Sequence, residues 1–290
     1  MKKIIKIASW TLLTITVLAV GFGIYMYQTD DMIRGMIHED ESKLYYYPSK
    51  EIASLEKFRY SEYELIVEDS IKIYTYHFKP LTAPKGNVFY IHGAGENATI
   101  WSSLIKPLVD YGFSVYAADW RGYGKSNGTP NYKGILKDTE AAFKDFIHKT
   151  QKDSLKTIVY GMSLGGQLAI KITKDNQDKV DALILDGSFE SAQRIAIDYA
   201  PFEFIKNKHR KHPEKFNQDY VGVRDIVDIR HIPKLIIHSI NDEGVPISHG
   251  KNLFKNAKEP KTFWETNTPH IMTLRDYPEE AIARINVLIQ

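Results

Sequence analysis

The chain has 290 residues, of which 43% are hydrophobic and 12% aromatic, so it is long and apolar enough for one large folded domain. It contains no cysteine, which excludes a thiol nucleophile, a disulfide framework and thiolate metal sites. The formal net charge is +2, and Lys2, Lys3 and Lys6 alone carry three positive charges. The rest of the chain is therefore close to neutral, which argues against nucleic acid as a partner.

The first predicted element is an apolar helix over residues 7–27, a stretch without any charged side chain. A helix of this length spans about 31 Å, close to the ~30 Å core of a bilayer. The lysines before it predict a short cytoplasmic N-terminus (residues 1–6), a transmembrane signal anchor (7–27) and an extracytoplasmic remainder. We thus expect a single-pass membrane protein.

The alternative is a cleaved signal peptide that would leave a secreted protein. The apolar run is longer than the core of most signal peptides. Its small residues Ala19, Gly21 and Gly23 offer only a poor cleavage site before bulky side chains. The uncleaved anchor is the favoured interpretation.

Residues 28–60 are predicted to be a connecting region with some helical character. Residues 63–67 and 71–78 then predict a pair of strands joined by a tight turn near Asp69 and Ser70. The second of these strands alternates apolar and polar side chains, as a half-buried antiparallel strand does.

Short apolar runs follow, most of them separated by stretches of helical period. The runs are residues 87–91, 114–118, 157–160, 182–185 and 234–237. This alternation predicts an α/β fold, with a mostly parallel central sheet and helices on both faces. Catalytic groups would then gather at the C-terminal ends of the strands.

The stretch from about residue 187 to 231 interrupts this alternation. It is longer than an ordinary loop and is rich in aromatic and charged side chains. We interpret it as a small helical cap inserted into a domain that covers residues 61–290.

The most specific motif is Gly161-Met162-Ser163-Leu164-Gly165, between an apolar strand and an amphipathic stretch. This context predicts a nucleophile elbow, in which glycines two residues either side let the chain turn sharply and expose Ser163. A second G-x-S-x-G match surrounds Ser126, but it lies in a run of turn-forming residues. We therefore predict Ser163 as the nucleophile.

A serine nucleophile needs a base, and the base needs an acid to orient it. Asp242 follows the strand near residues 234–239, and His270 follows a strand-like run at 262–265. The order Ser163, Asp242, His270 is the order of the alpha/beta-hydrolase triad. Asp186 is the reserve acid, and Glu243 is read as a solvated neighbour.

Two further histidines lie near enough to Asp242 in the chain to be alternative bases. His238 lies inside a strand and is read as a core histidine, whereas His249 begins a helix too close to Asp242. His270 remains the predicted base.

Hydrolysis by this route also needs two backbone amides that hold a developing oxyanion. Leu164, directly after the nucleophile, is one predicted donor. Ala94 in the loop His92-Gly93-Ala94-Gly95 is the other, with Gly93 and Gly95 as alternatives. His92 is expected to order this loop.

These motifs, together with the run from Asp119 to Gly128, resemble the alpha/beta-hydrolase superfamily over residues 61–290. The branch that they resemble holds serine-aminopeptidase-like, monoacylglycerol-lipase-like and depalmitoylase-like enzymes. The resemblance implies no cofactor and no metal, and it assigns Ser126 to a structural loop. It implies a serine hydrolase without naming the acyl or leaving group.

We therefore expect a membrane-anchored serine hydrolase that cleaves carboxylic esters or thioesters, with a small-molecule or lipid-like ester as substrate. A serine peptidase on the same fold and a non-catalytic ligand-binding protein are the alternatives. An acidic pocket for an α-amino group would favour the peptidase, and Glu190, Asp198 and Glu203 are the acids available in the cap. Substrate-binding residues and the oligomeric state are left open by the sequence.

Overall fold

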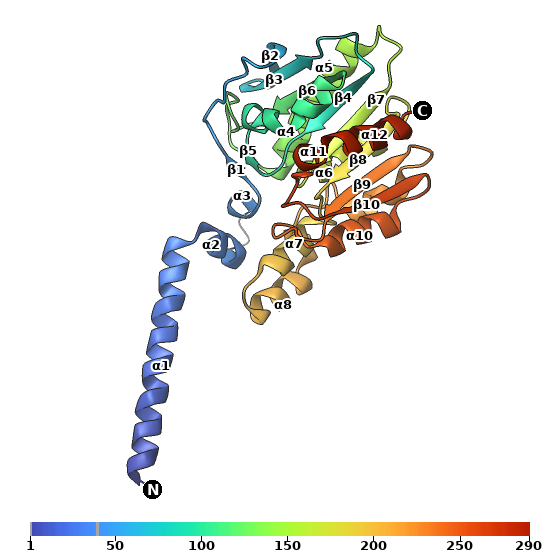
Figure 1. The fold of residues 1–290 in the computed structure, drawn as a ribbon. Helices are drawn as coiled ribbons and strands as arrows, with labels where there is room; N and C mark the ends of the chain where they lie inside the picture. The colour runs from blue at the N-terminus through green and yellow to red at the C-terminus, as the bar shows by residue number, and fades with distance from the viewer. Residues whose placement is uncertain (1, 39–40) are drawn as a thin grey trace.

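The computed structural model describes residues 2–38 and 41–290. Met1 and residues 39–40, which fall in the predicted N-terminal segment and connecting region, lie outside this description. Figure 1 shows a long helix, α1 (Lys2–Thr29), that projects from a layered body. Two short helices, α2 (Asp31–His38) and α3 (Glu41–Leu44), join it to that body.

The body is built on an eight-stranded sheet of order β10-β9-β8-β7-β4-β6-β3-β2. Strand β3 pairs antiparallel with β2 and with β6, and the other pairs are parallel. The mostly parallel sheet with an antiparallel N-terminal pair is thus confirmed. The strands are β2 (Arg59–Glu68), β3 (Ile71–Lys79), β4 (Gly86–Ile91), β6 (Phe113–Asp119), β7 (Thr157–Met162), β8 (Ala182–Asp186), β9 (Lys234–Ser239) and β10 (Lys261–Thr266).

Helices cover both faces of this sheet, as predicted. In β4, Phe89 and Ile91 belong to one apolar cluster and Val88 and Tyr90 to the other, because successive side chains of a strand point to opposite faces. The first cluster includes side chains of α5 (Tyr132–Thr150), α6 (Gly165–Asp175) and α10 (Ile247–Asn256). The second includes side chains of α4 (Ala98–Asp110), α11 (Thr273–Asp276) and α12 (Pro278–Leu288).

The insertion between β8 and β9 is helical. It contains α7 (Ala192–Tyr199), α8 (Glu203–Lys211), α9 (Gly222–Asp225) and the 3-10 turns η1 (Pro213–Lys215) and η2 (Ile226–Asp228). The segment before the sheet reaches it, since the Tyr45 hydroxyl donates to the carbonyl of Ala192 at 2.8 Å. A small parallel pair, β1 (Tyr47–Pro48) with β5 (Gly95–Glu96), is an element that the sequence did not indicate.

The turn from β7 into α6 is sharp and closely packed. Ser163 lies there with φ +51°, a conformation that costs a side-chain-bearing residue energy. A Cβ on Gly161 would lie 2.5 Å from the Cβ of Ala169, and one on Gly165 would overlap the carbonyl oxygens of Ile91 and His92. Both glycines are therefore required by close packing.

Replacing Gly165 by alanine should destabilise the fold by about 1–3 kcal/mol, because the new methyl group has no space. Gly95→Ala is the matched control, since a Cβ there meets nothing within 4 Å. Urea unfolding of the two variants compares them. Equal stability would contradict the packing account of the turn.

Candidate functional site

Ser163 is half-buried at the C-terminal end of β7. Its backbone N–H donates to the carbonyl of Asp186 at the end of β8, at 2.8 Å. On its other side lies Gly93, where an added Cβ would be 3.3 Å from the Cβ of Ser163. The serine thus lies between the loop after β4 and the end of β8.

Asp242 and His270 are brought together from two different loops, those that follow β9 and β10. His270 Nδ1 lies 2.6 Å from Asp242 Oδ2. The other carboxylate oxygen accepts the backbone N–H groups of Gly244 at 2.9 Å and Val245 at 2.7 Å. The Asp242 side chain is 1% exposed and the His270 side chain 26%, so a fixed, desolvated carboxylate holds an imidazole that reaches the surface.

The His270 ring is packed between two glycines. An added Cβ on Gly187 would lie 2.9 Å from His270 Cε1, and one on Gly244 would lie 3.2 Å from Cγ. Gly187 directly follows Asp186, the residue whose carbonyl binds the Ser163 backbone. The fold thereby places Ser163, Asp242 and His270 at the same edge of the sheet.

The reserve acid, Asp186, has a different partner. Its carboxylate accepts the Tyr160 hydroxyl at 2.8 Å, within the sheet. Burial raises the pKa of Asp186 to about 6, the nearby charge of Asp242 adds to this, and Tyr160 and His270 oppose it. The carboxylate on His270 Nδ1 is that of Asp242.

The other candidate histidines are buried. His238 Nε2 lies 2.8 Å from the carbonyl oxygen of Val245 and 3.5 Å from Asp242 Oδ2. This histidine therefore contacts the predicted acid from inside the core, a contact that the sequence did not indicate. His249 Nε2 lies 3.0 Å from Asp198 of the cap. Across residues 2–38 and 41–290, no group of three or more His, Asp or Glu side chains could hold a metal ion.

The loop after β4 is held at three points. Burial lowers the pKa of His92 to about 4, so its ring is neutral and its Nδ1, 2.8 Å from the Gly93 carbonyl, can donate. That carbonyl belongs to the same peptide unit as the Ala94 N–H. The carbonyl of Ala94 accepts the Tyr47 backbone N–H at 2.9 Å and the Tyr123 hydroxyl at 2.6 Å.

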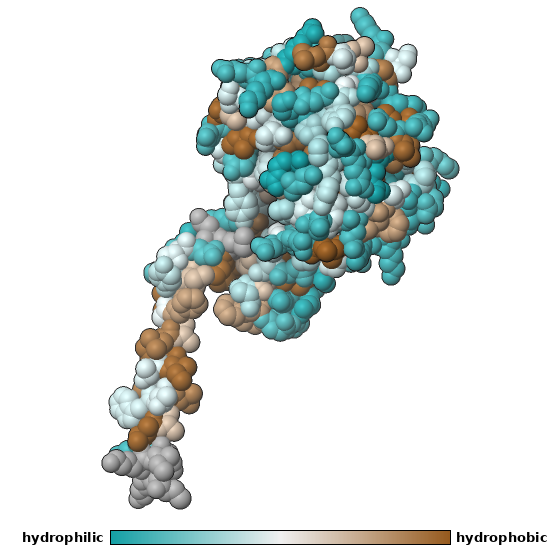
Figure 2. All heavy atoms as spheres, in the orientation of Figure 1, coloured by the Kyte–Doolittle hydropathy of each residue, from teal (hydrophilic) through white to brown (hydrophobic). Residues whose placement is uncertain are grey.

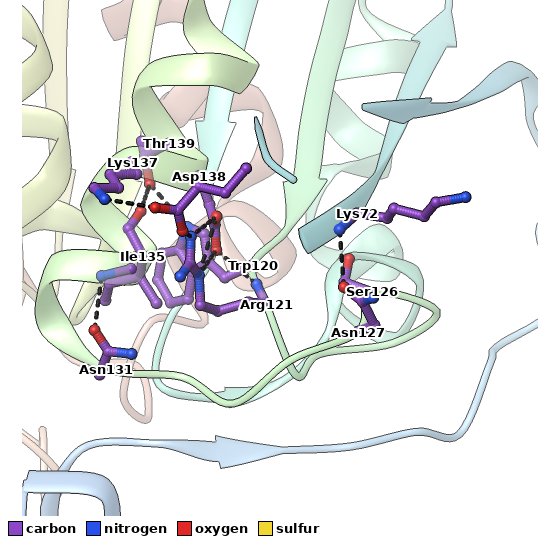
Figure 3. Close-up of polar contacts among 12 residues, drawn as sticks. Lys72, Trp120, Arg121, Ser126, Asn127, Asn131, Ile135, Lys137, Asp138 and Thr139 are labelled. Carbon is purple, nitrogen blue, oxygen red and sulfur yellow. Dashed lines mark hydrogen bonds and ion pairs between the residues drawn. The ribbon is translucent and has the colours of Figure 1, made fainter. Parts of the chain in front are cut away.

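The Ser126 side chain holds its loop in place through hydrogen bonds. Its hydroxyl donates to the carbonyl of Asp119 at 2.8 Å and accepts the Tyr74 N–H at 2.9 Å, and the residue has no exposed surface. Figure 3 shows the neighbouring Asn127, whose side-chain oxygen accepts the Lys72 N–H at 2.8 Å. The second G-x-S-x-G match therefore joins a loop to β3 and leaves no hydroxyl for attack.

The same loop is fixed to α5 through Arg121. Its guanidinium faces Asp138, with Nη2 to Oδ1 at 2.8 Å (Figure 3). The Arg121 backbone N–H also donates to Asp138, at 2.8 Å. Burial raises the pKa of Asp138 and the arginine opposes this shift. These contacts make the segment after β6 a scaffold beside the site.

A small cavity lies beside Leu164, between the cap, α5, α6 and the segment before β1. Its volume of about 10 Å³ is room for one water molecule. The cap and the segment that follows α1 together close this side of the site. Half of its lining residues are aromatic, and the full set is Glu41, Tyr45, Tyr46, Tyr132, Leu164, Gln167, Phe189, Ala192, Asn217 and Tyr220.

The raised pKa of Asp186 predicts a pH-dependent stability term. Between its ordinary pKa of 3.8 and about 6, the folded protein keeps the proton that the unfolded chain loses, so this residue destabilises the fold as pH rises. Asp186→Asn should therefore gain stability relative to the unchanged protein from pH 4 to pH 7. Urea unfolding across that range measures the difference, and a constant difference would contradict the shift.

The chain is similar to several known proteins. A family model described as serine aminopeptidase, S33 (Hydrolase_4) matches residues 82–212. The alpha/beta hydrolase domain-containing protein WAV2 of Arabidopsis thaliana is 30% identical, over 68% of this chain and 67% of WAV2. An uncharacterized membrane protein of Saccharomyces cerevisiae, YNL320W, is 27% identical over 68% of each chain.

Among solved structures, the Pyrococcus furiosus esterase Pf2001 is similar with a TM-score of 0.65 at 20% identity. The match covers 83% of this chain and 97% of the esterase, so the likeness extends over the whole body. A structural similarity at 20% identity is evidence for a shared fold. Together with the similarity to WAV2, it shows that the chain belongs to the alpha/beta-hydrolase superfamily.

Proposed function

We propose that the protein is a serine hydrolase that cleaves carboxylic esters or thioesters through an acyl-enzyme. The observation that carries the proposal is the strained Ser163 (φ +51°) at the same sheet edge as a hydrogen-bonded His270–Asp242 pair. In this proposal Ser163 Oγ attacks the carbonyl carbon, and His270 Nε2 takes its proton and later delivers it to the leaving group.

Asp242 would act by orienting the base. Its hydrogen bond to Nδ1 keeps the proton on that nitrogen and leaves Nε2 free to accept. The backbone N–H groups of Gly244 and Val245 keep the carboxylate in place. Because Asp242 is almost fully buried, its contact with the His270 ring is little screened by water.

The oxyanion would be held by the amides of Ala94 and Leu164. The His92 contact with the Gly93 carbonyl fixes the peptide unit that carries the Ala94 N–H. Tyr47 and Tyr123 fix the next unit through the Ala94 carbonyl. Donors held in this way need little reorganisation when charge develops, which is the basis of oxyanion stabilisation.

The peptidase alternative has weaker support. Glu190 binds Asn252 at 2.8 Å, and Glu203 binds Arg210 at 2.6 Å. Asp198 lies 3.0 Å from His249. Each acid considered for an α-amino group thus has a partner within the protein, so we favour esters and thioesters.

The proposal includes the membrane anchor. Residues Lys6–Thr29 of α1 form an apolar span that is not buried against the rest of the protein, and Figure 2 shows brown and pale side chains along it where the body surface carries much more teal. The YNL320W relative is described as a membrane protein. With the lysines on the cytoplasmic side, the catalytic domain would be extracytoplasmic. The alternative is that the N-terminal segment is a cleaved signal peptide. The mass of the mature protein would reveal cleavage as the loss of that segment.

Ser163→Ala should leave the protein folded and abolish covalent labelling by a fluorophosphonate probe. In the unchanged protein the adduct should map to the peptide that contains Ser163. Ser126→Ala is the matched control for the second motif and should still be labelled. An adduct on any other residue, or labelling that persists in Ser163→Ala, would refute the assignment.

Asp242→Asn should lower kcat by about four orders of magnitude, because the amide favours the wrong histidine tautomer. Asp186→Asn should keep most of the activity, because that carboxyl binds Tyr160 rather than His270. Ester and thioester hydrolysis measures both variants. A larger loss in Asp186→Asn would make Asp186 the functional acid.

A further inference from the structure

Helix α8 of the cap exposes aromatic and cationic side chains together. Phe202, just before the helix, is 51% exposed and Phe204 is 70% exposed, and their rings stack at 5.7 Å. Arg210 and Lys211 at its other end are exposed as well. Exposed phenylalanines beside cations are typical of helices that lie in a membrane interface.

The two faces of α8 differ sharply. Ile205 and His209, one turn apart, are buried at 2% and 0% exposure, and the His209 ring packs against Phe216 of the cap. Phe204, Asn207 and Lys211, spaced by three and four residues, share the opposite face. The aromatic and cationic groups therefore point away from the protein core.

Contacts place α8 beside the end of the predicted membrane span. Lys208 Nζ donates to the carbonyl of Ile37 in α2 at 3.0 Å. Only Asp30 separates α2 from α1. In Figure 1, α8 lies on the side of the body from which α1 projects.

The connection between α1 and the body is short and is held by hydrogen bonds. The Tyr27 hydroxyl lies 2.8 Å from His38 Nε2, and Arg34 donates to the carbonyl of Gln28 at 2.5 Å. Met36 of α2 is 1% exposed and belongs to the main apolar cluster. A body held this closely cannot stand far from a bilayer that α1 crosses.

We infer that the outward face of α8, with Phe202 and Phe204, docks onto the anionic lipid surface of the membrane that α1 spans. The inference rests on the proposed membrane anchor. The phenylalanines would enter the headgroup boundary, and Lys211 and Arg210 would contact lipid phosphates, Arg210 while it also pairs with Glu203. The cap would then lie on the membrane.

Membrane docking can be tested in the full chain with a fluorophore attached to one introduced cysteine. The protein has no cysteine of its own, so the label attaches at that position alone. Asn207→Cys, at the centre of the outward face, carries an environment-sensitive fluorophore. Leu81→Cys is the matched control, at a site 90% exposed in the turn between β3 and β4. Both proteins are reconstituted into phosphatidylcholine vesicles with or without phosphatidylglycerol, and a lipid-borne quencher is added.

Docking predicts quenching at position 207 and none at position 81, with more quenching when phosphatidylglycerol is present. Lys211→Gln should weaken docking about fivefold. Phe202→Ser with Phe204→Ser should abolish it. Equal quenching at the two positions would overturn the inference, and equal quenching in both lipid mixtures would overturn its anionic component.

Fluorophosphonate labelling of Ser163 in the same vesicles separates this inference from the proposed function. A labelled protein without quenching at position 207 would retain the hydrolase assignment and refute docking. Quenching in an unlabelled protein would retain docking and refute the hydrolase assignment. Labelling also reports that each α8 variant is folded.

Discussion

The positive φ of Ser163 is the constraint on which the rest of the site depends. A side-chain-bearing residue stays in that conformation only when its surroundings hold it there. The Ser163 backbone is kept in this conformation by the hydrogen bond between its N–H and the Asp186 carbonyl, and by close packing around Gly161 and Gly165. Adjacent parallel strands then bring the loops after β4, β8, β9 and β10 to the same edge.

Much of this arrangement could be predicted from local sequence. Apolar runs indicated the strands, and the G-x-S-x-G context distinguished Ser163 from Ser126. The structure gives the physical reason for that distinction, since the Ser126 hydroxyl is buried between Asp119 and Tyr74. The order of Ser163, Asp242 and His270 along the chain could be predicted because each follows a strand.

Contacts between distant segments could not be predicted in this way. Tyr47 binds the Ala94 carbonyl, and nothing in its local sequence marks it for that role. His238 was correctly read as a core residue, but its position 3.5 Å from the Asp242 carboxylate depends on how the loop after β9 folds back. Such contacts arise from chain topology, which local periodicity does not encode.

The segment after α1 also packs against the candidate site. It pairs with the loop after β4, bonds to the cap through Tyr45 and lines the cavity beside Leu164. A change in how α1 sits in a membrane would therefore reach the proposed oxyanion donor through few contacts.

The most direct test of the central claim is to trap the acyl-enzyme. The full chain is mixed with a chromogenic ester, quenched with acid at successive times and analysed by peptide mass spectrometry. The account predicts an acyl group on Ser163 that forms and decays at the rate of turnover, and that fails to form at that rate in His270→Ala. Ester turnover without any acyl group on Ser163 would contradict it.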